Sequence, residues 1–88
     1  MVTINIPKVL QKLTNYQEII ETKGSTIDEA LNNLCESYEN LKAHIYYPNG
    51  IVKSHILLAV NGNQVGSETV LNEGDSIDII IAAAGGYS

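Results

Sequence analysis

The sequence predicts an α+β domain in which one main helix packs on one face of a mixed sheet of four to five strands. Residues 25–41 have the apolar spacing of an amphipathic helix, whereas the segments before and after them show strand periodicity or are rich in isoleucine and valine. A single helix can cover only one face of a sheet, so the opposite face is expected to be exposed. The chain has 88 residues, which is enough for one domain.

The first two strands are predicted in the N-terminal part of the chain. In residues 2–6 three aliphatic side chains alternate with polar ones, as in a strand with one buried face. Pro7 has no N–H to donate to a ladder, so the chain is expected to bend away after it. Residues 16–22 predict a second strand, which ends at a turn formed by residues 23–25.

The helix is predicted over residues 25–41. Thr26 and Glu29 have the spacing of a capping box, in which the hydroxyl accepts an orphan N–H and the Glu side chain reaches back. Asp28 also lies in the first turn, where the helix dipole favours negative charge. The apolar positions form one stripe: Ile27, Ala30, Leu31, Leu34, Cys35, Tyr38 and Leu41.

The second half of the chain predicts a loop followed by further strands. Residues 47–53 contain the turn formers of a loop. Residues 54–65 predict a strand that runs into a tight turn at Asn61-Gly62. An acidic turn then precedes the last strand, which is expected over residues 76 to about 82. Alternate isoleucines of this strand share one face: Ile77, Ile79 and Ile81.

The order of these elements favours the β-grasp, or ubiquitin-like, arrangement. The chain runs strand, strand, helix and then more strands. With the first and last strands central and parallel, the helix crosses one face of a mixed sheet. Residues 1–82 are therefore expected to form the domain, and residues 83–88 a flexible C-terminal tail.

Composition and charge exclude several classes of function. The formal net charge is −5 and the five lysines are scattered, so nucleic-acid binding is not expected. An acidic domain is better suited to a basic patch on a protein partner. One cysteine permits neither an internal disulfide nor a Cys-based zinc site. The chain shows no signal peptide and no apolar stretch of membrane-spanning length, so the expected location is the cytoplasm.

No catalytic or metal site is expected within the chain. His44 and His55 lie outside any motif, so both are interpreted as ordinary surface or edge residues. Cys35 lies in the apolar stripe of the helix, and a role as core filler is favoured over a reactive thiol. These features argue against catalysis within this chain.

The C-terminal sequence AAAGGYS raises a separate question. A frayed terminus is the simplest interpretation, but such tails tend to be polar. Three alanines and two glycines have little side-chain bulk, and residues 82–86 would reach about 17 Å when extended. We therefore expect an arm that delivers a backbone carbonyl into the active site of another protein.

Together these segments resemble the ubiquitin-like sulfur carriers, the family that contains the thiamine-biosynthesis carrier and the small subunit of molybdopterin synthase. The helix opening STIDEAL, the turn VNGNQV, the acidic corner LNEGDSIDII and the tail AAAGG follow the family's order and spacing over essentially the whole chain. The tail and the corner before it are the specific part. The start, INIPKVLQKLTN, is most similar to the carriers used in cysteine biosynthesis.

The resemblance implies a reaction cycle at a terminal glycine carboxylate. An activating enzyme uses ATP to adenylate the carboxylate, and a sulfur donor displaces AMP to leave a thiocarboxylate. Carried over to this sequence, the acceptor is Gly86, while Gly85 and Ala84 let the tail thread through a narrow channel. The carrier itself is expected to bind no cofactor. The sulfur would pass to a synthase, and a cysteine-synthase-like enzyme is one candidate.

Tyr87 and Ser88 depart from the family pattern, because with them the terminal carboxylate belongs to Ser88. Some family members carry such an extension, and a zinc metalloprotease of the JAMM type removes it. The resemblance therefore implies a precursor that is cut between Gly86 and Tyr87. Vestigial or added residues are the simpler alternative.

Two other functions remain open. A ubiquitin-like modifier would use an activated Gly86 to form an isopeptide bond with a lysine, and it would share the fold and the tail. A β-grasp interaction module would need no acyl chemistry. For an activated tail we expect the exposed sheet face to dock the activating enzyme through the apolar residues Leu57, Ala59 and Ile80.

Overall fold

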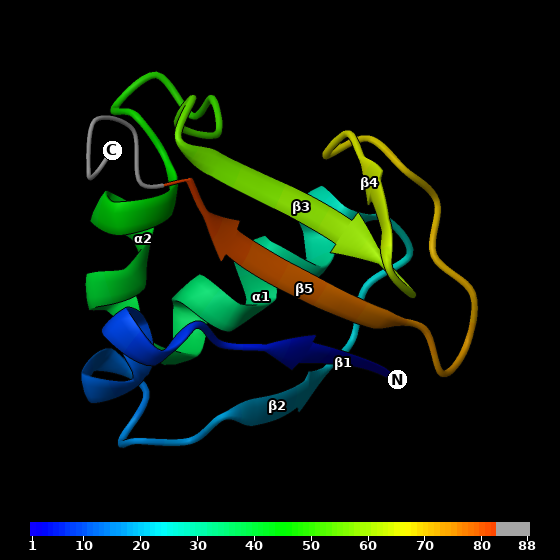
Figure 1. Ribbon diagram of the computed structural model, residues 1–88, viewed down its shortest axis with the longest axis horizontal. Helices are drawn as coiled ribbons and strands as arrows, with labels where there is room; N and C mark the ends of the chain where they lie inside the picture. The colour runs from blue at the N-terminus through cyan, green and yellow to red at the C-terminus, as the bar shows by residue number, and fades with distance from the viewer. Residues whose placement is uncertain (83–88) are drawn as a thin grey trace.

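The computed structural model describes residues 1–82 of the chain. Within this range five strands form one mixed sheet in the order β2-β1-β5-β3-β4, and two helices lie across one face of it (Figure 1). A 3-10 helix, η1, follows the first strand. The elements are β1 (Val2–Asn5), η1 (Lys8–Leu13), β2 (Ile19–Thr22), α1 (Ile27–Ser37), α2 (Glu39–Ile45), β3 (Ile56–Val60), β4 (Asn63–Val65) and β5 (Ser76–Ile81).

The first and last strands are adjacent, parallel and central, as the sequence predicts. β5 pairs parallel with β1 on one side and antiparallel with β3 on the other. Ile4 of β1 lies opposite Ile77 of β5, and both side chains are completely buried. The predicted mixed β-grasp sheet, with helix on one face, is therefore confirmed.

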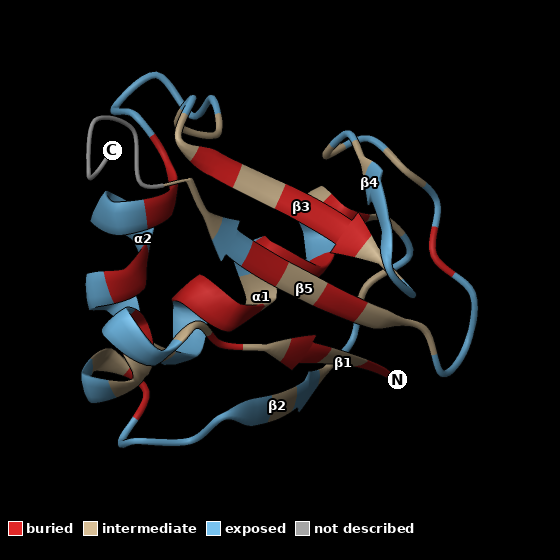
Figure 2. Ribbon diagram, viewed as in Figure 1, coloured by how far each residue is buried: buried red, intermediate tan, exposed pale blue. Residues whose placement is uncertain are grey.

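The core lies between the sheet and the two helices. Figure 2 shows buried residues where the strands and helices face each other, whereas β2 at the edge is largely exposed. Along β5, Ile77 and Ile79 are buried, whereas Asp78 between them is half-buried and Ile80 after them is 44% exposed, so the predicted alternation holds. The largest completely buried side chains are Ile4, Ile27, Leu31, Leu34, Leu41, Ile45, Ile77 and Thr14.

The start of α1 is capped both locally and by a distant loop. The backbone N–H of Glu29 donates to the Thr26 hydroxyl at 3.1 Å, as the capping box predicts. The Glu29 carboxylate, however, accepts from the N–H of Ser25 rather than from that of Thr26. The next orphan donors find carbonyl groups in the loop after β4: Ile27 N–H binds Thr69 at 3.1 Å, and Asp28 N–H binds Ser67 at 2.9 Å.

The prediction of one helix through residue 41 is wrong in its length. The chain leaves helical geometry at Tyr38, whose φ and ψ are −132° and 81°, and α2 begins at Glu39. Leu41 and Ile45 of α2 are still completely buried. The apolar spacing did not reveal the break, because a three-residue step keeps a side chain on the core side in either arrangement.

The second strand is shorter than predicted. Asn15 and Tyr16 have φ values of 55° and 62°, in the left-handed region, and a strand cannot include them. The buried Thr14 hydroxyl is within hydrogen-bond distance of the carbonyl oxygens of Gln11 and Gln17, at 3.1 and 3.0 Å, and so holds this loop against the core. β2 therefore begins at Ile19 instead of residue 16.

The predicted strand over residues 54–65 is a hairpin of two strands. Its turn lies at Asn61-Gly62, where φ is 51° and 91°, so the tight-turn prediction is confirmed. β3 begins at Ile56, and β5 ends at Ile81, one residue before the expected end. These are differences at the ends of elements.

Candidate functional site

The residues predicted to carry the chemistry lie outside the described part of the chain. This applies to Ala84, Gly85 and Gly86, and to the predicted cut between Gly86 and Tyr87. The described part of the site is the place where β5 ends and the chain continues toward these residues. Its geometry decides which surfaces surround the base of the tail.

The end of β5 is held on the β3 side. Ile81 lies opposite Ile56, and the N–H of Ala82 donates to the carbonyl oxygen of His55 at 2.8 Å. Because β5 is a central strand, its end is fixed by the sheet rather than by a side chain. The tail therefore starts from a defined point.

The sheet face opposite the helices presents a small apolar patch beside this point. Ile80 of β5 is 44% exposed, and Leu57 lies directly opposite it on β3 and is half-buried. Ala59 is only 4% exposed, so the prediction that it adds apolar docking surface is wrong. Ala59 lies between Gln64 of β4 and Asp78 of β5, its partners on the two neighbouring strands. We call Leu57 and Ile80 the sheet patch.

Two half-buried carboxylates lie farther from the tail, Asp78 in β5 and Asp75 in the turn just before this strand. Asp78 accepts a hydrogen bond of 2.6 Å from the side-chain amide of Asn5. Asp75 accepts from the N–H of Asn72 at 2.8 Å and from the side chain of Asn61 at 3.1 Å. Both acids therefore hold the sheet and the turn together and also make this end of the molecule negative.

On the helix side, a groove separates α2 from the segment that follows it. Its volume is about 620 Å³, and its walls include Lys42, Tyr47, Pro48 and Lys53. We call it the lysine groove. The Lys53 ammonium lies 5.9 Å from the centre of the Tyr47 ring. Hydrogen bonding with Ser54, assisted by the Lys53 charge, lowers the pKa of the Tyr47 hydroxyl.

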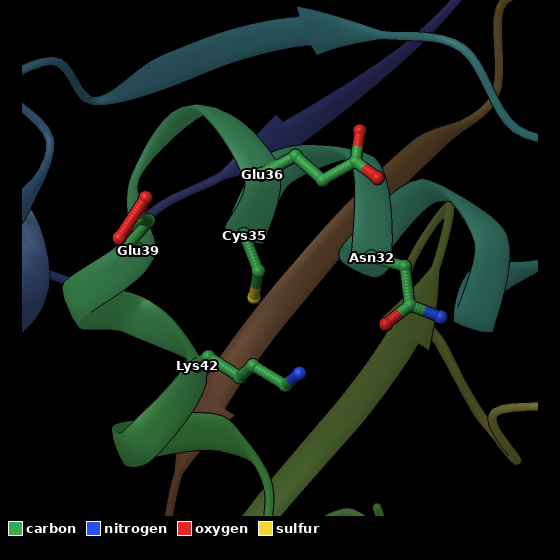
Figure 3. A pocket seen from close by; sticks show the side chains of 5 residues that line it. All are labelled: Asn32, Cys35, Glu36, Glu39 and Lys42. Atoms are coloured by element: carbon green, nitrogen blue, oxygen red, sulfur yellow. The ribbon is translucent and has the colours of Figure 1, made fainter.

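A second hollow, of about 580 Å³, lies between α1 and α2 next to Cys35 (Figure 3). The Cys35 sulfur points toward the Lys42 side chain. The residue is only 6% exposed, and burial raises the pKa of its thiol more than the Lys42 charge lowers it. A raised pKa reduces the thiolate fraction at neutral pH. The interpretation of Cys35 as part of the core is therefore confirmed.

The two histidines lie on different segments of the chain. His44 is exposed on α2, and His55 is half-buried just before β3. Among residues 1–82 no group of three or more His, Cys, Asp and Glu side chains could hold a metal ion. Within the same range no helix has the length and apolar character needed to cross a membrane.

The lysine groove is the feature that sequence reasoning missed. Residues 47–53 were predicted only as a loop, and Lys42 was counted among scattered charges. The signal available in the sequence was the run Tyr46, Tyr47 and Pro48, with Lys53 a few residues later. These residues indicate a basic groove only when the fold of α2 brings Lys42 to the same surface as Lys53.

The fold defines the class of protein to which the chain belongs. A mixed sheet with two central parallel strands, crossed on one face by helix, is the ubiquitin-like β-grasp. Within that class the chain belongs to the ThiS family, whose model matches residues 4–86. The family resemblance inferred from the sequence is therefore confirmed.

The curated relatives are sulfur carriers. The sulfur carrier protein CysO of Mycobacterium tuberculosis is 30% identical over 91 residues, which cover 97% of this chain and 98% of CysO. CysO of Mycobacterium bovis matches equally well. These are small carrier proteins of the ThiS and CysO type.

Solved structures agree with this assignment. The chain superposes on the crystal structure of the Amycolatopsis orientalis BexX/CysO complex with a TM-score of 0.88 and 28% identity, covering 97% of this chain and 99% of that one. The crystal structure of M. tuberculosis CysO matches with a TM-score of 0.86 and 26% identity, and the match covers 94% of this chain and 100% of that one. SAMP1 from Haloferax volcanii matches with a TM-score of 0.81 and 17% identity, and the match covers 96% of this chain and 97% of that one. At this identity the likeness shows the fold alone.

Proposed function

We propose that this chain is a sulfur carrier whose Gly86 is adenylated and converted to a thiocarboxylate after Tyr87 and Ser88 are removed. The thiocarboxylate then donates its sulfur in a biosynthetic reaction, with cysteine formation as the favoured case. The observation that carries the proposal is the extent of the family match, which runs through Gly86 and stops there. The CysO relatives, which are named sulfur carriers, support it.

Removal of the last two residues follows from the chemistry of activation. In the 88-residue chain Gly86 is joined to Tyr87 through an amide, whose nitrogen delocalises into the carbonyl and leaves no anionic oxygen to attack ATP. The carboxylate of Ser88 lies two residues beyond, and the Tyr87 ring would have to enter a channel suited to glycine. A misplacement of about 1 Å can already cost roughly a hundredfold in rate.

Three partner enzymes follow from this cycle. An activating enzyme uses ATP to form the acyl-adenylate, with release of pyrophosphate. A JAMM-type zinc metalloprotease cuts after Gly86, and a synthase accepts the sulfur. A cysteine-synthase-like enzyme is the favoured acceptor, because the relatives at 30% identity are CysO proteins. The CysO neighbour was crystallised in complex with BexX, which supports docking of such a domain onto a second protein.

We infer that the activating enzyme docks on the sheet patch. Leu57 and Ile80 are the apolar side chains beside the base of the tail, on the sheet face opposite α1 and α2. An enzyme that takes the tail into its active site must approach this end of the sheet. An apolar contact there would bury Ile80, which is 44% exposed in the free domain.

The deciding experiment compares the 88-residue chain with a chain that ends at Gly86. Each is incubated with activating enzyme, ATP and sulfide, and the intact mass is measured. The form ending at Gly86 should gain the mass difference of one sulfur for one oxygen, and the longer form should not. Equal amounts of thiocarboxylate on both chains would exclude the proposal that the 88-residue chain is an inactive precursor. No thiocarboxylate on either chain would exclude the carrier function.

A ubiquitin-like modifier remains the alternative, because the SAMP1 proteins share the fold. It would form covalent high-mass conjugates through Gly86 in cell extract, which a sulfur carrier would not. A β-grasp interaction module without acyl chemistry would keep its function after deletion of Gly85 and Gly86. The two experiments separate these three functions.

A further inference from the structure

We propose that the lysine groove is a second docking site for the activating enzyme and that it receives an acidic segment of that enzyme. The inference rests on the proposed function and adds a contact on the helix side of the tail, opposite the sheet patch. It concerns Lys42 and Lys53, which form no ion pair with a carboxylate among residues 1–82.

The charge of the groove is distinctive within this molecule. The chain carries a net charge of −5, yet two of its five lysines line this one groove. Between residues 1 and 82 the recorded ion pair joins the Met1 amino group to Glu73, so neither groove lysine has a carboxylate partner there. Glu39 also lines the groove, which leaves an excess of one positive charge. Two ammonium groups that have no carboxylate partner among the described residues favour a carboxylate-bearing ligand.

Side-chain and backbone contacts hold the walls of the lysine groove in place. The Tyr47 hydroxyl lies 3.3 Å from the Ser54 hydroxyl, and Lys53 lies over the Tyr47 ring. The N–H of Tyr47 donates to the carbonyl of Ile51 at 2.8 Å, closing the segment on itself. Tyr47 is nevertheless 41% exposed, so an aromatic face remains available. Tyrosine in such a position is typical of protein–protein contacts.

Backbone hydrogen bonds join the groove to the base of the tail. The N–H of Lys53 donates to Ile45, the last residue of α2, at 2.8 Å. The carbonyl of Lys53 accepts from Ile56 at 3.0 Å, and the carbonyl of His55 accepts from Ala82 at 2.8 Å. Lys53 is therefore only two residues away from the point that holds the tail. An enzyme that encloses the tail must come close to it.

Two other occupants are less suitable. Residues 83–88 are a less suitable occupant, because fixing six residues costs more conformational free energy than one exposed ion pair returns. A second copy of the chain carries the same net charge of −5 and would be repelled. An acidic segment of the enzyme meets the lysines without either penalty.

The second contact also gives a physical advantage. A domain held only by its tail and one apolar patch can turn about the tail. The half-buried Asp78 lies in β5 and the half-buried Asp75 in the turn before it, whereas Lys42 and Lys53 line the groove on the helix side. This unequal distribution, with acids toward the start of β5 and lysines beside the base of the tail, allows one orientation of the docked domain and disfavours the reversed one.

The test uses two double variants of the chain that ends at Gly86. Lys42→Gln with Lys53→Gln removes the groove charges, and Lys8→Gln with Lys23→Gln removes two exposed lysines elsewhere. Both variants have a net charge of −7, that is −5 less two positive charges. Thiocarboxylate formation is measured with the activating enzyme, ATP and sulfide over a range of carrier concentrations. Thermal unfolding verifies that both variants are folded.

We expect kcat/KM for the groove variant to fall about tenfold at low salt, through a higher KM with kcat little changed. The control variant should stay within about twofold of the unsubstituted chain. The difference should shrink at about 0.5 M salt, because screening weakens the ion pairs.

Equal kcat/KM for the two variants, with an active unsubstituted chain, would overturn the groove proposal and leave the sulfur-carrier function intact. No thiocarboxylate on the unsubstituted chain would overturn both. If deletion of residues 83–88 shifts the NMR signals of the groove amides, the tail and not the enzyme occupies the groove. If the chain forms a dimer that the groove variant abolishes, a second copy of the chain is the occupant.

Discussion

The backbone N–H of Ala82 donates a hydrogen bond of 2.8 Å to the carbonyl oxygen of His55, so the last described residue is still joined to the segment that leads into β3. The six residues after Ala82 therefore start from a fixed position. The sheet patch lies on one side of this position and the lysine groove on the other. Under the proposed function, an activating enzyme that accepts the tail would approach both surfaces.

The first prediction tests the sheet patch. Ile80→Asp places a charge in the exposed apolar contact, and we expect kcat/KM for thiocarboxylate formation to fall about tenfold or more. Val70→Asp, at a side chain that is 70% exposed and lies outside the patch, is the control. Similar rates for the two variants, both folded by circular dichroism, would show that the enzyme docks elsewhere.

The second prediction concerns the core. Leu34 of α1 is 1% exposed, and Leu34→Ala should lower the free energy of unfolding by about 2–5 kcal/mol because it leaves a cavity between helix and sheet. In so small a domain this could remove most of the stability. Urea unfolding gives the value, with Val9→Ala at a 64% exposed site as the control. An unchanged midpoint for Leu34→Ala would contradict the packing described.

The third prediction concerns the close approach of the chain to α1 at Gly24. A Cβ atom on Gly24 would lie 2.6 Å from the backbone nitrogen of Ala30 and 2.7 Å from its Cα. Backbone atoms of a packed helix cannot easily move aside, so Gly24→Ala should destabilise the domain by about 1–3 kcal/mol.

The matched control is Gly66→Ala. There the added Cβ meets only the Glu68 carboxylate, at 2.6 Å, and this exposed side chain can rotate away. Thermal unfolding should therefore separate the two variants. Equal melting temperatures would mean that residues 24 and 30 are farther apart than the structure places them.

The fourth prediction is a pH dependence. Burial, the negative charge of Asp28 and a hydrogen bond of 3.2 Å to its carboxylate raise the pKa of the Tyr46 hydroxyl above its ordinary value of 10.0. Above pH 10 the unfolded chain loses this proton while the folded chain keeps it. The folded state then binds more protons, so stability must fall as the pH rises. Below pH 10 the contribution is fully present.

Tyr46→Phe removes this titration. Unfolding by urea at pH 7 and pH 10.5 should show a smaller loss of stability for Tyr46→Phe than for the unsubstituted chain. The variant also loses the bond to Asp28, so only the change between the two pH values is compared. An identical loss in both proteins would rule out a raised Tyr46 pKa.

Much of the fold follows from signals that lie within a few residues of each other. The cap at Thr26 and Glu29, the turn at Asn61-Gly62 and the alternation in β5 were all predicted correctly. Each depends on local backbone geometry or on a short period of burial, which neighbouring residues determine. The family resemblance rests on the same short segments and on their order along the chain.

Tertiary structure decided the features that depend on residues distant in sequence. The break at Tyr38 lets α2 turn while it keeps Leu41 and Ile45 buried, and the apolar spacing permits a straight helix equally well. Ala59 occupies an exposed-face position but is buried by its neighbours.

The surroundings of the tail were decided in the same way. The sequence by itself determined that the chain ends in a Gly-Gly tail with two further residues. Only the folded chain joins Ile45 to Lys53 and His55 to Ala82 through backbone hydrogen bonds, and so places the lysine groove beside the base of the tail. Such pairings depend on which segments meet in the folded chain, and no local pattern of residues encodes them.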